Sequence, residues 1–196
     1  MTPVISPFSL FFASIFTGNI LLANFLGMCS FISISKDMKS SNGLGFAVTV
    51  VLTVTTGVNW AVLQLLTALG LVYLRYIVFI IVIAAVVQML EMIIDRVSQS
   101  LYMSLGIFLP LITVNCAILG VSLFMEIRDY SFWQSVVFGF GSGLGWWLSI
   151  MALSAIRKKL DKAPVPAGLK GAGITVITIG FMAMAFIGFS GMLQVQ

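Results

Sequence analysis

The chain contains no histidine, only two cysteines, and few charges: ten basic and six acidic residues, or 8% of its 196 positions. An ordinary soluble domain is about 25% charged, so this shortage excludes a water-soluble fold. Because 60% of the residues are hydrophobic, the chain is predicted to be an integral membrane protein. Its apolar runs are too long, and too rarely interrupted, to be the alternating strands of an outer-membrane barrel.

Six apolar segments are long enough to cross a bilayer. A hydrocarbon core about 30 Å thick requires roughly 20 apolar residues of helix, and such segments take up nearly the whole chain. We therefore expect residues 1–196 to form one all-α membrane domain of six spans. The expected spans are about 7–34, 43–65, 72–94, 101–124, 132–156 and 169–192.

The basic residues are distributed unequally between the two sides of the membrane. Eight lie in the connections after spans 1, 3 and 5, whereas two lie on the opposite side. Since basic loops stay in the cytoplasm, we expect both termini to lie outside. The asymmetry also explains the net charge of +4, so no nucleic-acid partner is expected. The eight are Lys36, Lys39, Arg96, Arg157, Lys158, Lys159, Lys162 and Lys170, and the two are Arg75 and Arg128.

The six spans divide into two sets of three, residues 1–98 and 99–196. Because three is odd, a repeat between the halves must have inverted topology. When the first spans of the two halves are aligned in sequence, "ILLANFLGMC" matches "LITVNCAILG", so Asn24 corresponds to Asn115. Each half then carries one cysteine in its first span, Cys29 or Cys116.

Spans 1 and 4 are expected to be discontinuous. If both were straight helices, Cys29 would lie near the inner end of the first and Cys116 past the middle of the fourth, so the thiols would be far apart. Residues that interrupt helices occur in both spans, and irregular backbone at membrane depth is tolerated where protein buries it. The interruptions are Thr17–Asn19 and Gly27 in span 1, and Pro110 followed by Asn115 in span 4.

The two cysteines have three interpretations. A free cysteine packs as a small hydrophobe, and most lone membrane cysteines do only that. A disulfide is disfavoured, because burial in the membrane shields both thiols from the oxidising side. The third interpretation is a metal site, but an iron–sulfur cluster needs four thiolates, and the chain has no histidine to complete the set. Such a site would require two cysteines from a second, homologous chain.

Several stretches resemble one family of membrane subunits. It comprises the D and E subunits of the sodium-translocating NADH:quinone oxidoreductase and the A and E subunits of the Rnf ferredoxin:NAD oxidoreductase. The most specific stretch is "LGIFLPLITVNCAILG", and the resemblance covers nearly the whole chain. The stretch "RDYSFWQSVVFGFGSGLGW" looks more like the quinone-reductase E subunit than its Rnf counterpart. Further similar stretches are "NFLGMCSF", "FIIVIAAVVQMLEMIIDR" and "VPAGLKGAGITVITIGFMAMAFIGFSG".

This resemblance implies a subunit of the bacterial inner membrane that pairs, in inverted orientation, with the homologous D subunit. Cys29 and Cys116 match the cysteine positions of the family, so the two chains would hold one intramembrane 2Fe-2S cluster. The cluster would relay electrons from the cytoplasmic flavin side toward FMN and quinone, coupled to Na⁺ translocation.

NADH, FAD, FMN and quinone would be bound by the A, B, C and F subunits of the complex. This chain has no Gly-rich turn between a strand and a helix with which to bind a dinucleotide. We therefore expect a non-autonomous subunit of the enzyme, with no active site of its own.

Four residues near the cysteines are candidates for supporting an irregular backbone. Asn24 and Asn115 could satisfy amides that interrupted helices leave unpaired, and Gly27 and Gly120 could allow close approach of the backbone. Tight helix packing is the alternative interpretation for all four.

Glu91 is a candidate for the Na⁺ pathway, because an acidic side chain within a membrane helix is costly and is usually functional. The alternative is that Glu91 reaches the cytoplasmic interface or pairs with Arg96. The run "GFGSGLGWW" (139–147) has small residues all round a helix, which predicts close packing against a neighbouring span or a partner subunit. Its tryptophans, Trp146 and Trp147, are interpreted as aromatic bulk in the core.

Two other functions share part of this pattern. The homologous A subunit of the Rnf complex would use the same cysteines for the same cluster, with ferredoxin as the electron donor. A small transporter with an inverted repeat would instead bind an ion or solute near the midplane, at Asn24 and Asn115. That transporter would need no iron.

Overall fold

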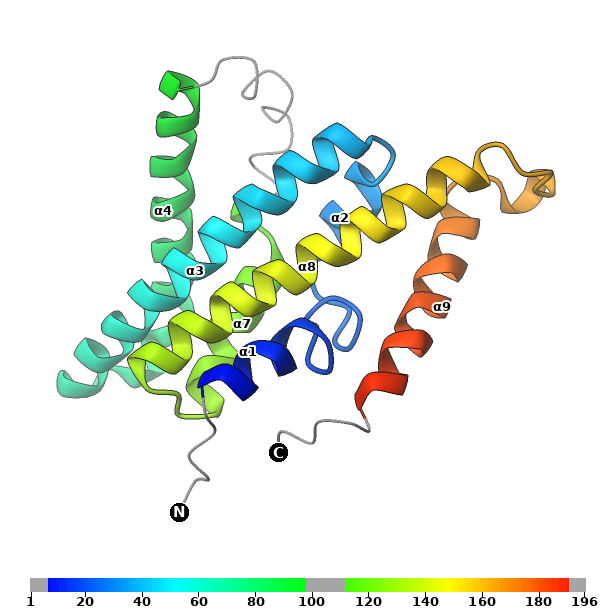
Figure 1. Cartoon of the computed structure of the whole chain (residues 1–196). Coiled ribbons are helices and arrows are strands. Elements are labelled where there is room, and N and C mark those ends of the chain that lie inside the picture. The colour runs from blue at the N-terminus through cyan, green and yellow to red at the C-terminus, as the bar shows by residue number, and fades with distance from the viewer. Residues whose placement is uncertain (1–6, 98–111, 191–196) are drawn as a thin grey trace.

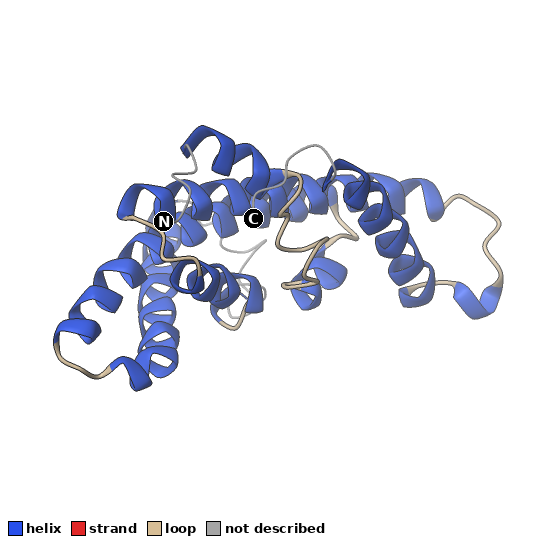
Figure 2. Cartoon of the chain, turned by 90° about the horizontal axis from the view of Figure 1, so that it is seen from below, coloured by secondary structure: helices blue, strands red, loops and turns tan. Residues whose placement is uncertain are grey.

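The computed structural model describes residues 7–97 and 112–190, and within these ranges it contains helices, turns and loops but no strand (Figures 1 and 2). The predicted all-α class is confirmed for this part of the chain. The α-helices are α1 (Pro7–Ile15), α2 (Met28–Ile34), α3 (Met38–Ala68), α4 (Arg75–Val97), α7 (Cys116–Ile127), α8 (Phe132–Leu160) and α9 (Ala172–Ser190), with 3₁₀ turns η1 at Val72–Leu74 and η2 at Ala167–Leu169.

Three helical segments are long and apolar enough to cross a membrane: Met38–Ala68, Val72–Ile93 and Phe132–Leu160. They coincide with the spans expected near 43–65, 72–94 and 132–156. Apolar helices at Cys116–Ile127 and Ala172–Gly188 are shorter. The first part of the span expected at 101–124 lies outside the described residues.

Local sequence signals set where the helices begin. Asp37 caps α3, and its carboxylate accepts hydrogen bonds from the backbone N–H and the hydroxyl of Ser40. Ser131 and Gln134 form a capping box at the start of α8. Each of these side chains satisfies an N–H group that the first helical turn leaves unpaired.

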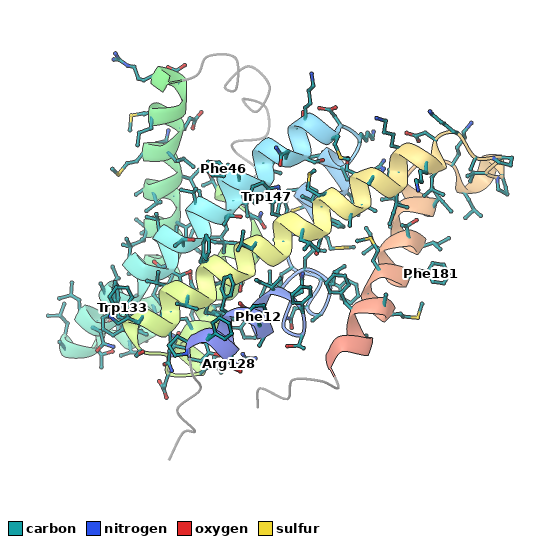
Figure 3. All side chains as sticks on the ribbon, viewed as in Figure 1. Phe12, Phe46, Arg128, Trp133, Trp147 and Phe181 are labelled. Atoms are coloured by element: carbon teal, nitrogen blue, oxygen red, sulfur yellow. The ribbon has the colours of Figure 1, made fainter. Side chains whose placement is uncertain are left out.

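Helices α3 and α8 form an antiparallel pair at the centre of the molecule (Figure 1). At one end of the pair, Trp60 Nε1 donates to Tyr130 O at 2.9 Å. Toward the other end, Trp147 Nε1 donates to Asn42 Oδ1 at 3.1 Å, and Trp147 lies beside Phe46 (Figure 3).

The glycine run of α8 packs against neighbouring segments on two sides. Gly139 and Gly143 face α3, where Thr56 and Thr49 are their nearest neighbours, whereas Gly141 and Gly145 face α1. The run therefore lets one helix approach α1 and α3 closely, as expected for small residues at a helix interface.

The remaining helices surround this centre. Helix α4 packs on α3 and α7, and its Phe79, Ile83 and Val87, which recur every four residues, are buried. Helix α7 is joined to α3 by a buried hydrogen bond from Asn59 Nδ2 to Ser122 Oγ, 2.8 Å long. Helix α9 lies across α8 from α4, and Phe181 projects away from the other helices (Figures 1 and 3).

Candidate functional site

The chain is not α-helical between α1 and α2, over residues 16–27. Asn19 is fully buried in this segment, and its Nδ2 donates to Ile15 O at 3.1 Å, to Gly145 O at 2.9 Å and to Ser149 Oγ at 3.0 Å. Its Oδ1 accepts from two backbone N–H groups, at Leu21 and Leu22. One amide side chain thus ties the irregular segment to α8 and satisfies backbone groups that have no helical partner.

The predicted support residue Asn24 lies in the same segment and is exposed. Sequence reasoning identified Thr17–Asn19 as an interruption but missed the role of Asn19 within it. The local signal was an amide residue directly after a glycine. Its partners on α8, however, lie 126 and 130 positions away along the chain.

The segment ends in a tight turn that presents Cys29. Phe25 and Gly27 both have positive φ angles, 56° and 85°, and α2 begins directly after Gly27. Cys29 is therefore in the first turn of α2, where its side chain is exposed. The turn is held from within by Ser30, whose hydroxyl donates to Gly27 O at 3.1 Å.

Cys116 occupies a similar place at the start of α7. Asn115 caps this helix, and its Oδ1 accepts from the backbone N–H of Ala117 at 3.0 Å. Asn115 is buried, whereas Cys116, the first residue of the helix, is exposed. The other end of the Asn115 amide, Nδ2, lies 3.4 Å from Ser30 Oγ on α2.

The two cysteine-bearing turns are in direct contact. The backbone N–H of Gly27 donates to Cys116 Sγ, with 2.9 Å between nitrogen and sulfur. Leu26 packs against Gly120, one turn further along α7. The structure thus brings Cys29, Cys116, Gly27, Asn115 and Gly120 to one place.

Trp146 forms the inner wall of this site, and sequence reasoning missed that position. It is fully buried, as predicted for core aromatic bulk, and its ring packs edge-on against Phe31 of α2. Its Nε1 has no hydrogen-bond partner among the described residues and faces Gly27, since a Cβ added to that glycine would lie 2.8 Å from it.

The donor set fits half of an iron–sulfur site. Both thiols are free and exposed, so neither fills the core of this chain. No group of three or more histidine, cysteine, aspartate or glutamate side chains comes together in the described part of the chain. Thiolates are the ligands that iron–sulfur clusters use, and a 2Fe-2S cluster takes four of them, so this chain would supply two.

Glu91 lies in the last two turns of α4 and is half-buried. Within the described ranges, no ion pair joins Glu91 to Arg96, which is exposed. The ion pair found in the described ranges lies at the other end of α4, where Arg75 pairs with Glu126 near the end of α7.

Comparison with known proteins agrees with the resemblance expected from the sequence. A family model described as "Rnf-Nqr subunit, membrane protein" matches residues 7–193. The chain is 55% identical over 190 residues to a Serratia proteamaculans protein named as the E subunit of Na(+)-translocating NADH-quinone reductase, covering 93% of this chain and 96% of that protein. The Photorhabdus laumondii protein of that name is 54% identical with the same coverage, and the one from Rhodopirellula baltica is 50% identical over 204 residues. The chain therefore belongs to the Rnf-Nqr family of membrane-embedded subunits.

Proposed function

We propose that this chain is the E-type membrane subunit of a sodium-translocating NADH:quinone reductase, and that Cys29 and Cys116 supply two ligands to an intramembrane 2Fe-2S cluster. The observation that carries the proposal is the hydrogen bond from Gly27 N–H to Cys116 Sγ. It joins the turn directly before Cys29 to the other thiol, although the two cysteines are 87 positions apart (116 − 29).

The exposure of both thiols supports a site shared between two chains. A homologous D-type subunit in inverted orientation would bring the other two thiolates and cover the exposed pair. The two cysteines also have similar local geometry, because each lies in the first turn of a helix that follows a non-helical residue. We take this as support for a 3+3 inverted repeat with discontinuous spans, in which α1 and α2 are the two parts of the first.

The 2Fe-2S cluster, when bound, supplies one-electron transfer. The residues of this chain hold the ligands in place: Asn19 fixes the segment before Cys29 on α8, and Asn115 caps the helix that begins with Cys116. The buried Trp146 excludes water from the inner side of the site. The A, B, C and F subunits would carry NADH, the flavins and quinone, and Na⁺ uptake through Glu91 is a further part of the proposal.

The expected orientation in the bacterial inner membrane agrees with the position of the basic residues. Arg157, near the end of α8, donates from Nη1 to Ile32 O at 2.9 Å and to Ser35 Oγ at 2.7 Å, so it lies beside the basic connection between α2 and α3. Two basic clusters thus meet at one end of the central pair, where a cytoplasmic surface would gather positive charge. Both termini would lie outside.

The test is iron and acid-labile sulfide in the purified complex, compared with complexes that carry Cys29→Ser or Cys116→Ser. We expect both variants to lose the intramembrane cluster, because a hydroxyl replaces one of four required thiolates. Thr67→Ser, an equally small change at the exposed far end of α3, is the control and should keep it. Full iron and sulfide in both cysteine variants would show that neither thiolate is needed to hold the cluster.

A further inference from the structure

We propose that the backbone N–H of Gly27 raises the reduction potential of the cluster by donating to the sulfur of Cys116. This inference rests on the proposed function, since it takes Cys116 to be a cluster ligand. The nitrogen lies 2.9 Å from Cys116 Sγ. Gly27 is therefore a positioning residue whose effect on the cluster passes through Cys116.

The direction of the effect follows from charge. Adding an electron to the cluster increases the negative charge on its sulfurs, so a donor aimed at a ligand sulfur stabilises the reduced state more than the oxidised state. Hydrogen bonds to the sulfurs are among the main determinants of cluster potential. In the described ranges, Cys116 receives such a bond and Cys29 receives none. The two sulfurs supplied by this chain are thus unequal.

The conformation that aims this N–H at the sulfur favours glycine. Gly27 has φ 85° and ψ 16°, in the left-handed region where a side chain is strained. There is also no room for a side chain, because an added Cβ would lie 2.8 Å from Trp146 Nε1 and 3.0 Å from Asn115 Oδ1. Glycine therefore satisfies both the backbone angle and the space.

The residues packed around Gly27 hold its backbone N–H in place. Trp146 is fully buried and packs against Phe31. Asn115 is held by its hydrogen bond from the N–H of Ala117, whose Cβ closes a third side at 3.2 Å from the added Cβ. The N–H group is therefore preorganised and does not depend on a mobile side chain.

The first experiment labels the assembled complex with [¹⁵N]glycine and records pulsed EPR spectra of the reduced intramembrane cluster, identified by the loss of its signal in Cys116→Ser. We expect a weak ¹⁵N coupling, transmitted from the Gly27 nitrogen through the hydrogen bond to the cluster. A labelled cluster without any ¹⁵N coupling would overturn the inference. No variant at Gly27 has to fold for that result.

The second experiment replaces the glycine with Gly27→Ala and titrates the cluster potentiometrically. The added Cβ should push the turn away from Trp146 and lengthen the N–H···S bond. We expect a more negative midpoint potential, with iron retained. Alanine carries no glycine label, so the ¹⁵N coupling should also disappear, which assigns that coupling to residue 27. Gly180→Ala, on α9, is the control and should leave the potential unchanged, because no described residue lies within 4 Å of the added Cβ.

The outcomes separate the two proposals. An intramembrane cluster that survives Cys29→Ser and Cys116→Ser would defeat the proposed function and this inference with it. A cluster that depends on both cysteines, but keeps its potential or its ¹⁵N coupling in Gly27→Ala, would defeat only the role of Gly27. If Gly27→Ala fails to assemble a cluster, the role of Gly27 is decided by whether the labelled parent complex shows the ¹⁵N coupling.

Discussion

The close packing of α8 on α3 can be tested with a single methyl group at Gly143. A Cβ added there would lie 2.7 Å from Thr49 Cα, 3.0 Å from Thr49 Cγ2 and 3.1 Å from Thr49 Cβ. The nearest atom belongs to the backbone, so a change of rotamer at Thr49 cannot relieve the contact. Gly143→Ala must therefore move the two helices apart.

The expected cost combines two terms. Overpacking a close interface destabilises by about 1–3 kcal/mol, whereas replacing glycine with alanine inside a helix stabilises by about 0.5–1 kcal/mol. Comparison with Gly57→Ala isolates the overpacking cost. Gly57 lies on α3 and faces α8, and its added Cβ would make only an ordinary contact, 3.5 Å from Val136 Cγ2. Relative to Gly57→Ala, we expect Gly143→Ala to lose about 1–3 kcal/mol.

Thermal unfolding of the full-length chain in detergent measures this difference. At about 2–4 °C for each kcal/mol, the midpoint of Gly143→Ala should fall roughly 2–12 °C below that of Gly57→Ala. Equal midpoints for the two variants would refute the close approach of α3 and α8 at Thr49.

Two further predictions concern Asn19 and Asp37. Asn19→Ala leaves the backbone N–H groups of Leu21 and Leu22 without their partner, and each such group costs about 1–3 kcal/mol. Its unfolding midpoint should fall clearly, while exposed Asn24→Ala changes stability by less than about 0.5 kcal/mol; equal effects would argue against the buried network. The hydrogen bonds from Ser40 lower the pKa of Asp37. Its stabilising contribution is therefore present above the unfolded pKa of about 3.9 and disappears as the pH falls through the folded pKa. The stability difference between the parent and Asp37→Asn should vanish in acid, and a difference independent of pH would contradict this.

Much of the architecture could be predicted from the sequence, because it depends on local composition. Long apolar runs located the helices at Met38–Ala68 and Phe132–Leu160, since the length of a run and its lack of charge are independent of tertiary contacts. The family was also recognisable, because stretches such as residues 105–120 keep their identity along the chain. The glycine run likewise predicted close packing, although not the neighbours on either side.

The cysteine site was only partly predictable. Glycine and asparagine near each cysteine pointed to irregular backbone, and the structure has non-helical residues before both helices. The glycine before Asn19 marked an interruption, but it did not show that Asn19 rather than Asn24 lies within hydrogen-bond reach of α8. The environment of Trp146 was equally hidden, because it depends on how α8 passes behind Gly27.

The sequence by itself determined that this is a helical membrane protein with two cysteines in corresponding apolar segments, because hydrophobic length and residue order are properties of the chain alone. Only the tertiary structure decided that the turn before Cys29 meets Cys116, that Gly27 donates to its sulfur, and that Asn19 anchors the segment to α8. These contacts join residues about 90 to 130 positions apart. They form because buried polar groups must find partners wherever folding brings them.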